Sequence, residues 1–165
     1  MVLATHAVAG AVLASFFPKY PLLAFCVGFF SHFLLDAIPH WDYHLASLSQ
    51  DQSDKMNTDM KLGRVFAFDL LKIAADVVLG FVFTFLLFLF FGIPLHTAFI
   101  FGAFGGIAPD FLQFVYMKWK HEPLLSLQKF HMWIHSKISL KGRYLLGPLL
   151  QVLFLFMLIF IVLKK

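Results

Sequence analysis

Histidine and aspartate residues recur through a chain that is otherwise dominated by apolar side chains. Imidazole nitrogens and carboxylate oxygens bind zinc, manganese and iron, and an ion of this kind can promote hydrolysis. We expect eight of these residues to be metal ligands: His6, His32, Asp36, His40, His44, Asp110, His131 and His135. Two further carboxylates, Asp42 and Asp76, are candidate catalytic groups. The sequence therefore predicts a divalent-metal centre, with zinc favoured over manganese or iron, and enough donors for two or more ions.

The spacing of these residues supports shared sites. His32 and Asp36 are four residues apart, as are His131 and His135, and residues four apart share one face of a helix. Two imidazoles at this spacing can chelate one metal ion. The sequence therefore predicts one helical His/Asp pair and one helical His/His pair.

Residues 39–44 form a third pattern, because His and Asp alternate there. In an extended chain, alternate side chains point the same way, so His40, Asp42 and His44 are expected to act together. Three basic residues are candidates to bind a substrate phosphate: Lys72, Lys137 and Arg143.

Composition defines the elements that must position these groups. The chain has 165 residues, of which 61% are hydrophobic, and only 22 formal charges. Soluble globular proteins are about half apolar and about a quarter charged, so an ordinary soluble domain is excluded, as is a disordered chain. The solvent for most of this surface is expected to be lipid.

The long apolar runs predict an all-α, polytopic integral membrane protein that forms a single domain over residues 1–165. About five transmembrane helices are expected, at residues 1–17, 21–38, 65–91, 95–117 and 144–163. Residues 39–64 and 118–143 are the expected cytoplasmic loops, and the second contains an amphipathic helix. Residues 105–109, Gly-Gly-Ile-Ala-Pro, are either a helix break before Asp110 or a site of close packing.

Charge distribution predicts the orientation. Nine of the 13 basic residues lie in the two loops expected to be cytoplasmic, and basic loops are retained on that face. The N-terminus is therefore predicted in the cytoplasm and the C-terminus outside the inner membrane. The positive charge is interpreted as topogenic, with membrane lipid as the partner and no nucleic acid. A single cysteine, Cys26, excludes intrachain disulfides, and the oligomeric state stays open.

The expected depths of the ionisable residues agree. His6 and His32 lie eleven residues from the same outer turn, or about 16 Å along a helix. Asp76 and Asp110 lie about 23 Å from the other outer turn. All four are therefore expected in the cytoplasmic half of the membrane.

Structural roles are the alternative for each group. Asp69 and Lys72 could form an ion pair that holds helices together, and His6 could be a buried, hydrogen-bonded core residue. Residues 40–44 could form a hydrated loop, and residues 131–135 the polar face of an interfacial helix. A metal centre is favoured because separate segments place their acids and imidazoles on one side of the membrane.

Several short motifs also resemble a known family. They are Thr5-His6, Pro109-Asp110 or residues 39–42, residues 131–136, and the Ser-His-x-x-x-Asp element at residues 31–36. Together they resemble the bacterial inner-membrane, metal-dependent hydrolases described as LexA-binding membrane-bound hydrolases. This resemblance implies metal-dependent hydrolysis. A looser likeness to zinc-dependent phospholipase C implies phosphoester chemistry.

These observations predict a membrane-bound metal-dependent hydrolase that acts on a phosphoester or lipid headgroup at the cytoplasmic face. One alternative is a metal-ion or proton transporter, with a relay through Asp69, Asp76, His32 and Asp110. Transport is disfavoured because residues 77–91 and 145–163 are polar only at Thr84 and Gln151. A non-catalytic membrane scaffold is the other alternative.

Overall fold

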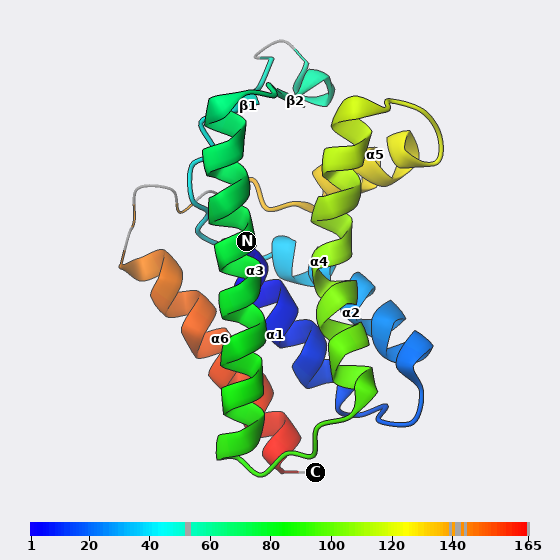
Figure 1. Ribbon diagram of the computed structural model, residues 1–165, viewed down its shortest axis with the longest axis vertical. Helices are drawn as coiled ribbons and strands as arrows, with labels where there is room; N and C mark the ends of the chain where they lie inside the picture. The colour runs from blue at the N-terminus through cyan, green and yellow to red at the C-terminus, as the bar shows by residue number, and fades with distance from the viewer. Residues whose placement is uncertain (52–53, 139, 141–142, 144, 165) are drawn as a thin grey trace.

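The computed structural model describes residues 1–51, 54–138, 140, 143 and 145–164. Lys141, Tyr144 and Lys165, which belong to the predicted loops and last span, lie outside these residues. Six α-helices make up most of the described chain, which confirms the all-α class (Figure 1). Their bounds are α1 Leu3–Ala14, α2 Pro21–Asp36, α3 Arg64–Phe90, α4 Thr97–Lys118, α5 Leu124–Ile134 and α6 Leu146–Leu163.

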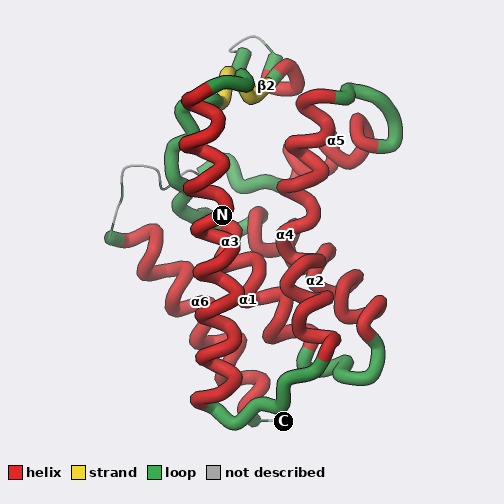
Figure 2. Tube along the Cα trace, viewed as in Figure 1, coloured by secondary structure: helices red, strands yellow, loops and turns green. Residues whose placement is uncertain are grey.

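A short β-hairpin lies between α2 and α3 (Figure 2). Strand β1, Leu48–Ser49, pairs antiparallel with β2, Asp59–Met60, and a 3₁₀ turn at Lys55–Asn57 lies between them. The ammonium of Lys118, the last residue of α4, lies 2.6 Å from Asp59 Oδ1 and so fixes the hairpin to α4.

Helix α1 is the centre of the bundle, and α2, α3, α4 and α6 all contact it (Figure 1). Every residue from position 5 to position 12 is buried. The sequence of this helix is apolar on nearly all faces and rich in alanine, which is the pattern expected of a helix enclosed by others. The sole ionisable side chain inside α1, His6, is therefore completely enclosed.

Glycines bring α1, α2 and α4 into backbone contact. A Cβ atom added at Gly102 would overlap the Gly10 carbonyl of α1, and one added at Gly106 would overlap the His6 carbonyl. On the other side of α4, a Cβ added at Gly105 would overlap the Phe25 carbonyl of α2. Small residues at helix interfaces permit this close approach. Of the two alternatives for residues 105–109, close packing is therefore the one observed, and the helix break is not, because α4 continues through Pro109.

The turn between α3 and α4 follows from its glycine. Gly92 has φ of +64°, a conformation that glycine adopts without a steric penalty. The Ile93 N–H donates to the Phe88 carbonyl and the Gly92 N–H to the Leu89 carbonyl, which is the Schellman arrangement at a helix end. The predicted break between the apolar segments at residues 65–91 and 95–117 is therefore confirmed.

Three helices, α3, α4 and α6, are long and apolar enough to cross a membrane. The sequence predicted about five membrane-spanning helices, and three of them have the length that a span needs. Helices α1 and α2 have 12 and 16 residues, so they are about 18 and 24 Å long, less than the roughly 30 Å of bilayer hydrocarbon. The expected spans at residues 1–17 and 21–38 were too long because residues 15–20 form the turn and α2 ends at Asp36.

The close packing predicts that Gly106→Ala destabilises the protein. The added methyl group would push α4 away from α1, and overpacking of this kind costs about 1–3 kcal/mol. Thermal unfolding in detergent should show a lower Tm than the wild type. Ala67→Leu, which adds a larger group at an exposed position of α3, is the control and should leave the Tm almost unchanged. An unaltered Tm for Gly106→Ala would contradict the packing described here.

Candidate metal centre

The carboxylate of Asp36, at the end of α2, is the meeting point of four imidazoles. Its Oδ2 atom lies 2.9 Å from His131 Nε2 and 3.1 Å from His32 Nε2. Its Oδ1 atom lies 3.2 Å from His6 Nε2 and 3.8 Å from His40 Nε2. These histidines come from α5, α2, α1 and the segment after α2, so four separate segments converge on one buried acid.

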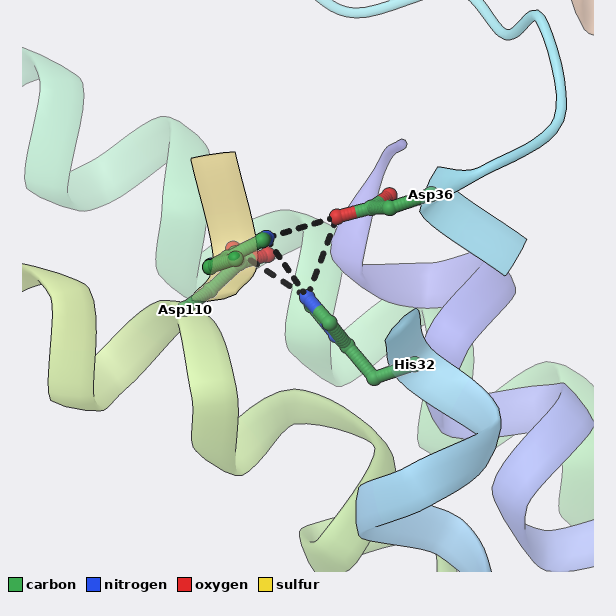
Figure 3. Close-up of side chains that lie close together, drawn as sticks. His32, Asp36 and Asp110 are labelled. Carbon is green, nitrogen blue, oxygen red and sulfur yellow. Dashed lines mark hydrogen bonds and ion pairs between the residues drawn. The ribbon is translucent and has the colours of Figure 1, made fainter. Parts of the chain in front are cut away.

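One group of donors comprises His32, Asp36, Asp110 and His131, whose ligand atoms all lie within 4.8 Å of one another. Figure 3 shows His32 and Asp36 of α2 and Asp110 of α4 pointing toward one another. His32 Nε2 is 3.3 Å from His131 Nε2 and 3.6 Å from Asp110 Oδ1. Ligands of one tetrahedral zinc ion, bound at about 2.0–2.1 Å, are about 3.3–3.4 Å apart. These residues could therefore hold a metal ion after small side-chain adjustments.

Hydrogen bonds at the far side of each imidazole prepare it for this role. His32 Nδ1 lies 2.8 Å from the Gly106 carbonyl oxygen, and a carbonyl can only accept a hydrogen bond. The hydrogen of neutral His32 is therefore on Nδ1, and the Nε2 lone pair faces the group. Metal-binding histidines commonly donate their other N–H to a carbonyl or carboxylate in this way.

A second group comprises Asp36, His40 and His135, again with ligand atoms within 4.8 Å of one another. His40 Nδ1 lies 2.8 Å from the Ile38 carbonyl oxygen, and His135 Nδ1 lies 3.1 Å from the Ser136 carbonyl oxygen. Both Nε2 atoms are therefore available as ligands. Asp36 is common to the two groups.

His6 lies beneath both groups and is completely buried. Its ring stacks on that of His32, with centroids 3.9 Å apart and an interplanar angle of 22°. The prediction that these two residues share one depth is confirmed. Within the described part of the chain, neither ring nitrogen of His6 has a hydrogen-bond partner.

Backbone hydrogen bonds align the segment after α5 with the segment after α2. The Ser136 N–H donates to the Asp36 carbonyl at 2.7 Å, and the Leu140 N–H donates to the His40 carbonyl at 3.2 Å. This pairing places His135 beside His40, with ring centroids 4.8 Å apart.

The expected helical chelate of His131 and His135 is wrong. Helix α5 ends at Ile134, and His135 has an extended backbone with φ of −58° and ψ of 132°. The two rings are 6.0 Å apart and belong to different donor groups. The two residues are four apart, as in a helical pair, but α5 ends one residue before His135, so the two side chains do not share a helix face. His44 also departs from its predicted pattern, because its side chain is exposed and joins neither group.

Asp42 stands next to the second group. Its Oδ2 atom lies 3.4 Å from His40 Nε2, and its Oδ1 atom lies 3.0 Å from the Met1 ammonium. Burial by itself would raise the pKa of Asp42, but His40 and the ammonium outweigh it and hold that pKa below its usual range. The side chains of Asp42 and Asp110 are 30% and 28% exposed, so this edge of the centre is accessible.

Asp76 belongs to neither group of donors. Its Oδ2 atom accepts a hydrogen bond of 2.7 Å from the backbone N–H of Leu3, which is the first residue of α1. A carboxylate at a helix N-terminus satisfies an otherwise unpaired N–H group. Asp76 thus anchors the start of the helix that carries His6. Burial and the nearby Asp76 carboxylate also raise the pKa of the Tyr43 hydroxyl above its usual range.

Of the three predicted phosphate-binding residues, Lys72 already has a carboxylate partner. Lys72 pairs with Asp69 at 2.9 Å, and Asp69 also accepts hydrogen bonds of 2.7 Å from the backbone N–H and hydroxyl of Ser47. Asp69 and Lys72 therefore form the ion pair of the structural alternative, but within α3, and Asp69 ties Ser47 of the segment before β1 to that helix. The side chains of Lys137 and Arg143 are exposed.

Some positioning groups left no signal in the sequence. The carbonyls of Gly106, Ile38 and Ser136 orient three imidazoles, but every residue has a carbonyl. Gln151 gave a weak signal as a rare polar residue in α6. It accepts a hydrogen bond of 2.9 Å from the Thr5 hydroxyl and donates one of 2.8 Å to the Trp41 carbonyl, so it ties α6 to the segment that carries His40 and Asp42.

Comparison of the chain with protein-family models, with curated proteins and with solved structures finds no significant match.

Proposed function

We propose that this protein is a membrane-bound, metal-dependent hydrolase that acts on a phosphoester or lipid headgroup. The observation that carries this proposal is the group of His32, Asp36, Asp110 and His131, with four ligand atoms from three helices within 4.8 Å of one another. Two imidazoles and two carboxylates suit zinc first, and manganese or iron as alternatives. The motif resemblance to bacterial inner-membrane hydrolases favours the same reaction class.

A divalent ion supplies two kinds of chemistry when bound: it lowers the pKa of a coordinated water and polarises a phosphoryl or acyl oxygen. Residues of the chain orient the ligands and accept the proton. The Gly106 carbonyl keeps the Nε2 lone pair of His32 directed at the ion. Asp42, whose carboxylate lies at the accessible edge beside His40, is placed to accept a proton from the attacking water. Because His6, His32 and Asp36 are buried, substrate approaches from the edge formed by Asp42 and Asp110.

The membrane arrangement that we propose keeps the five apolar helices of the sequence prediction in the inner membrane. Helices α3, α4 and α6 cross it, and the shorter α1 and α2 form a hairpin from the outer face. The basic loops and the metal centre then lie toward the cytoplasm, with the N-terminus on that side and the C-terminus outside. Exposed Lys137 and Arg143 would attract anionic headgroups, which makes membrane lipid the favoured substrate.

The layer beneath the centre favours hydrolysis over transport. Immediately below His6, Ala7 and Ala11 of α1 pack against Ala103 of α4, with Phe99 and Ile107 alongside. Deeper in the bundle, the Thr84 hydroxyl donates to the Gly80 carbonyl of its own helix. Among the described residues these contacts leave no chain of polar groups toward the outer face, which an ion relay would need.

Asp42→Asn should lower the turnover of a phospholipid or soluble phosphodiester substrate by about 10²-fold or more, because general-base catalysis contributes about that much. The protein should retain at least one metal ion per chain, since Asp42 lies outside the first donor group. Metal content and turnover are measured on the same purified sample. His96→Ala, an exposed residue on the opposite turn, is the control. Full activity in Asp42→Asn would contradict its assigned role.

The proposed topology is tested by cysteine labelling in a Cys26→Ser background. Cysteines placed at Gln50, in the loop after α2, and at Lys164, at the end of α6, are both exposed. A membrane-impermeant maleimide added to intact cells should label position 164 only, whereas position 50 should react only after lysis. Labelling of both positions in intact cells would contradict the arrangement.

A further inference from the structure

The face of Asp36 that lies away from the first donor group has donors of its own. Oδ2 faces His32 and His131, whereas Oδ1 lies 3.2 Å from His6 Nε2 and 3.8 Å from His40 Nε2. His135 offers a further nitrogen within 4.8 Å of the ligand atoms of Asp36 and His40. The two oxygens of one carboxylate therefore serve two different sets of imidazoles.

The imidazoles around Oδ1 have free lone pairs. His40 and His135 each have Nδ1 against a backbone carbonyl, which leaves Nε2 as the ligand atom. His6 is 0% exposed; its Nε2 contacts Asp36 Oδ1 without hydrogen-bond geometry, and its Nδ1 has no hydrogen-bond partner among the described residues. A buried polar group without a partner is unfavourable, and it indicates a ligand that the protein is built to receive.

The charge around Oδ1 is also suited to a cation. The Met1 ammonium lies 3.1 Å from Asp36 Oδ1 and 3.0 Å from Asp42 Oδ1. These two carboxylates thus hold one positive charge between them, with Asp36 buried and Asp42 at the accessible edge. A divalent ion that displaced the ammonium would make the same charge pairing and would, in addition, satisfy the imidazole lone pairs.

We propose that a second divalent ion is bound by Asp36 Oδ1, His40 and His135, with His6 beside Asp36 Oδ1, and that Asp36 bridges it to the first ion. This inference rests on the proposed function, because the first ion is the hydrolytic one. Ions bridged in this way are about 3.5–4 Å apart, and such a pair can bind both the attacking and the leaving oxygen of a phosphoester. The substrate class that this arrangement favours is a phosphoester over a carboxylic ester.

The test uses the full chain in detergent, reconstituted with Mn²⁺. Metal analysis should give two ions per chain, and electron paramagnetic resonance should show the exchange-coupled signal of a Mn²⁺ pair. His40→Ala and His135→Ala should each reduce the content to one ion and abolish the coupling. His121→Ala, an exposed histidine outside both groups, should retain two coupled ions.

One ion per wild-type chain, with hydrolysis intact, would overturn the second site and leave the proposed function standing. Absence of bound Mn²⁺, Zn²⁺ and Fe²⁺ would overturn both. Two ions without magnetic coupling would overturn the bridging role of Asp36. Two ions in both His40→Ala and His135→Ala would overturn the ligand assignment. The number of ions and their magnetic coupling are measured on the wild-type protein, so these results do not depend on whether a variant folds.

Discussion

The burial of one carboxylate, Asp36, is the constraint on which the rest of this structure depends. An ionised carboxylate without compensation is too unfavourable to bury, so it must be surrounded by hydrogen-bond donors or positive charge. Here the Met1 ammonium lies 3.1 Å from the carboxylate, and His6, His32, His40 and His131 surround it, each able to donate to it when Nε2 carries a proton and to hold an ion beside it when Nε2 does not. Every segment that contributes one of these groups is thereby drawn to the end of α2.

Close helix packing makes this convergence possible. An imidazole reaches only a few ångströms beyond its own backbone, so α1, α2 and α4 must nearly touch. The glycines at 102, 105 and 106 remove the side chains that would separate them, and the Gly106 backbone both contacts His6 and receives the His32 hydrogen bond. The same residue thus sets the distance between helices and the orientation of a metal-binding nitrogen.

The parts of this arrangement that sequence alone predicted are those set by local periodicity. The i,i+4 relation of His32 and Asp36 and the common depth of His6 and His32 both follow from helix geometry. The positions of His135 and Asp76 could not be predicted in this way. The role of His135 depends on where α5 ends, and the role of Asp76 depends on where α1 begins relative to α3. Likewise, apolar runs located every membrane-length helix, whereas the true lengths of α1 and α2 depended on their turns. Contacts between distant segments carry no periodic signal.

The metal centre can be examined by X-ray absorption at the zinc edge of protein purified without chelator. We expect bound zinc with nitrogen and oxygen ligands only, and with the outer-shell scattering of at least two imidazoles. At least one equivalent of zinc should be lost from the His32→Ala/His131→Ala double variant, which removes two donors of the first group, and none from His121→Ala. Wild-type protein that contains neither zinc nor another divalent metal, or zinc retained in full by the double variant, would contradict the account.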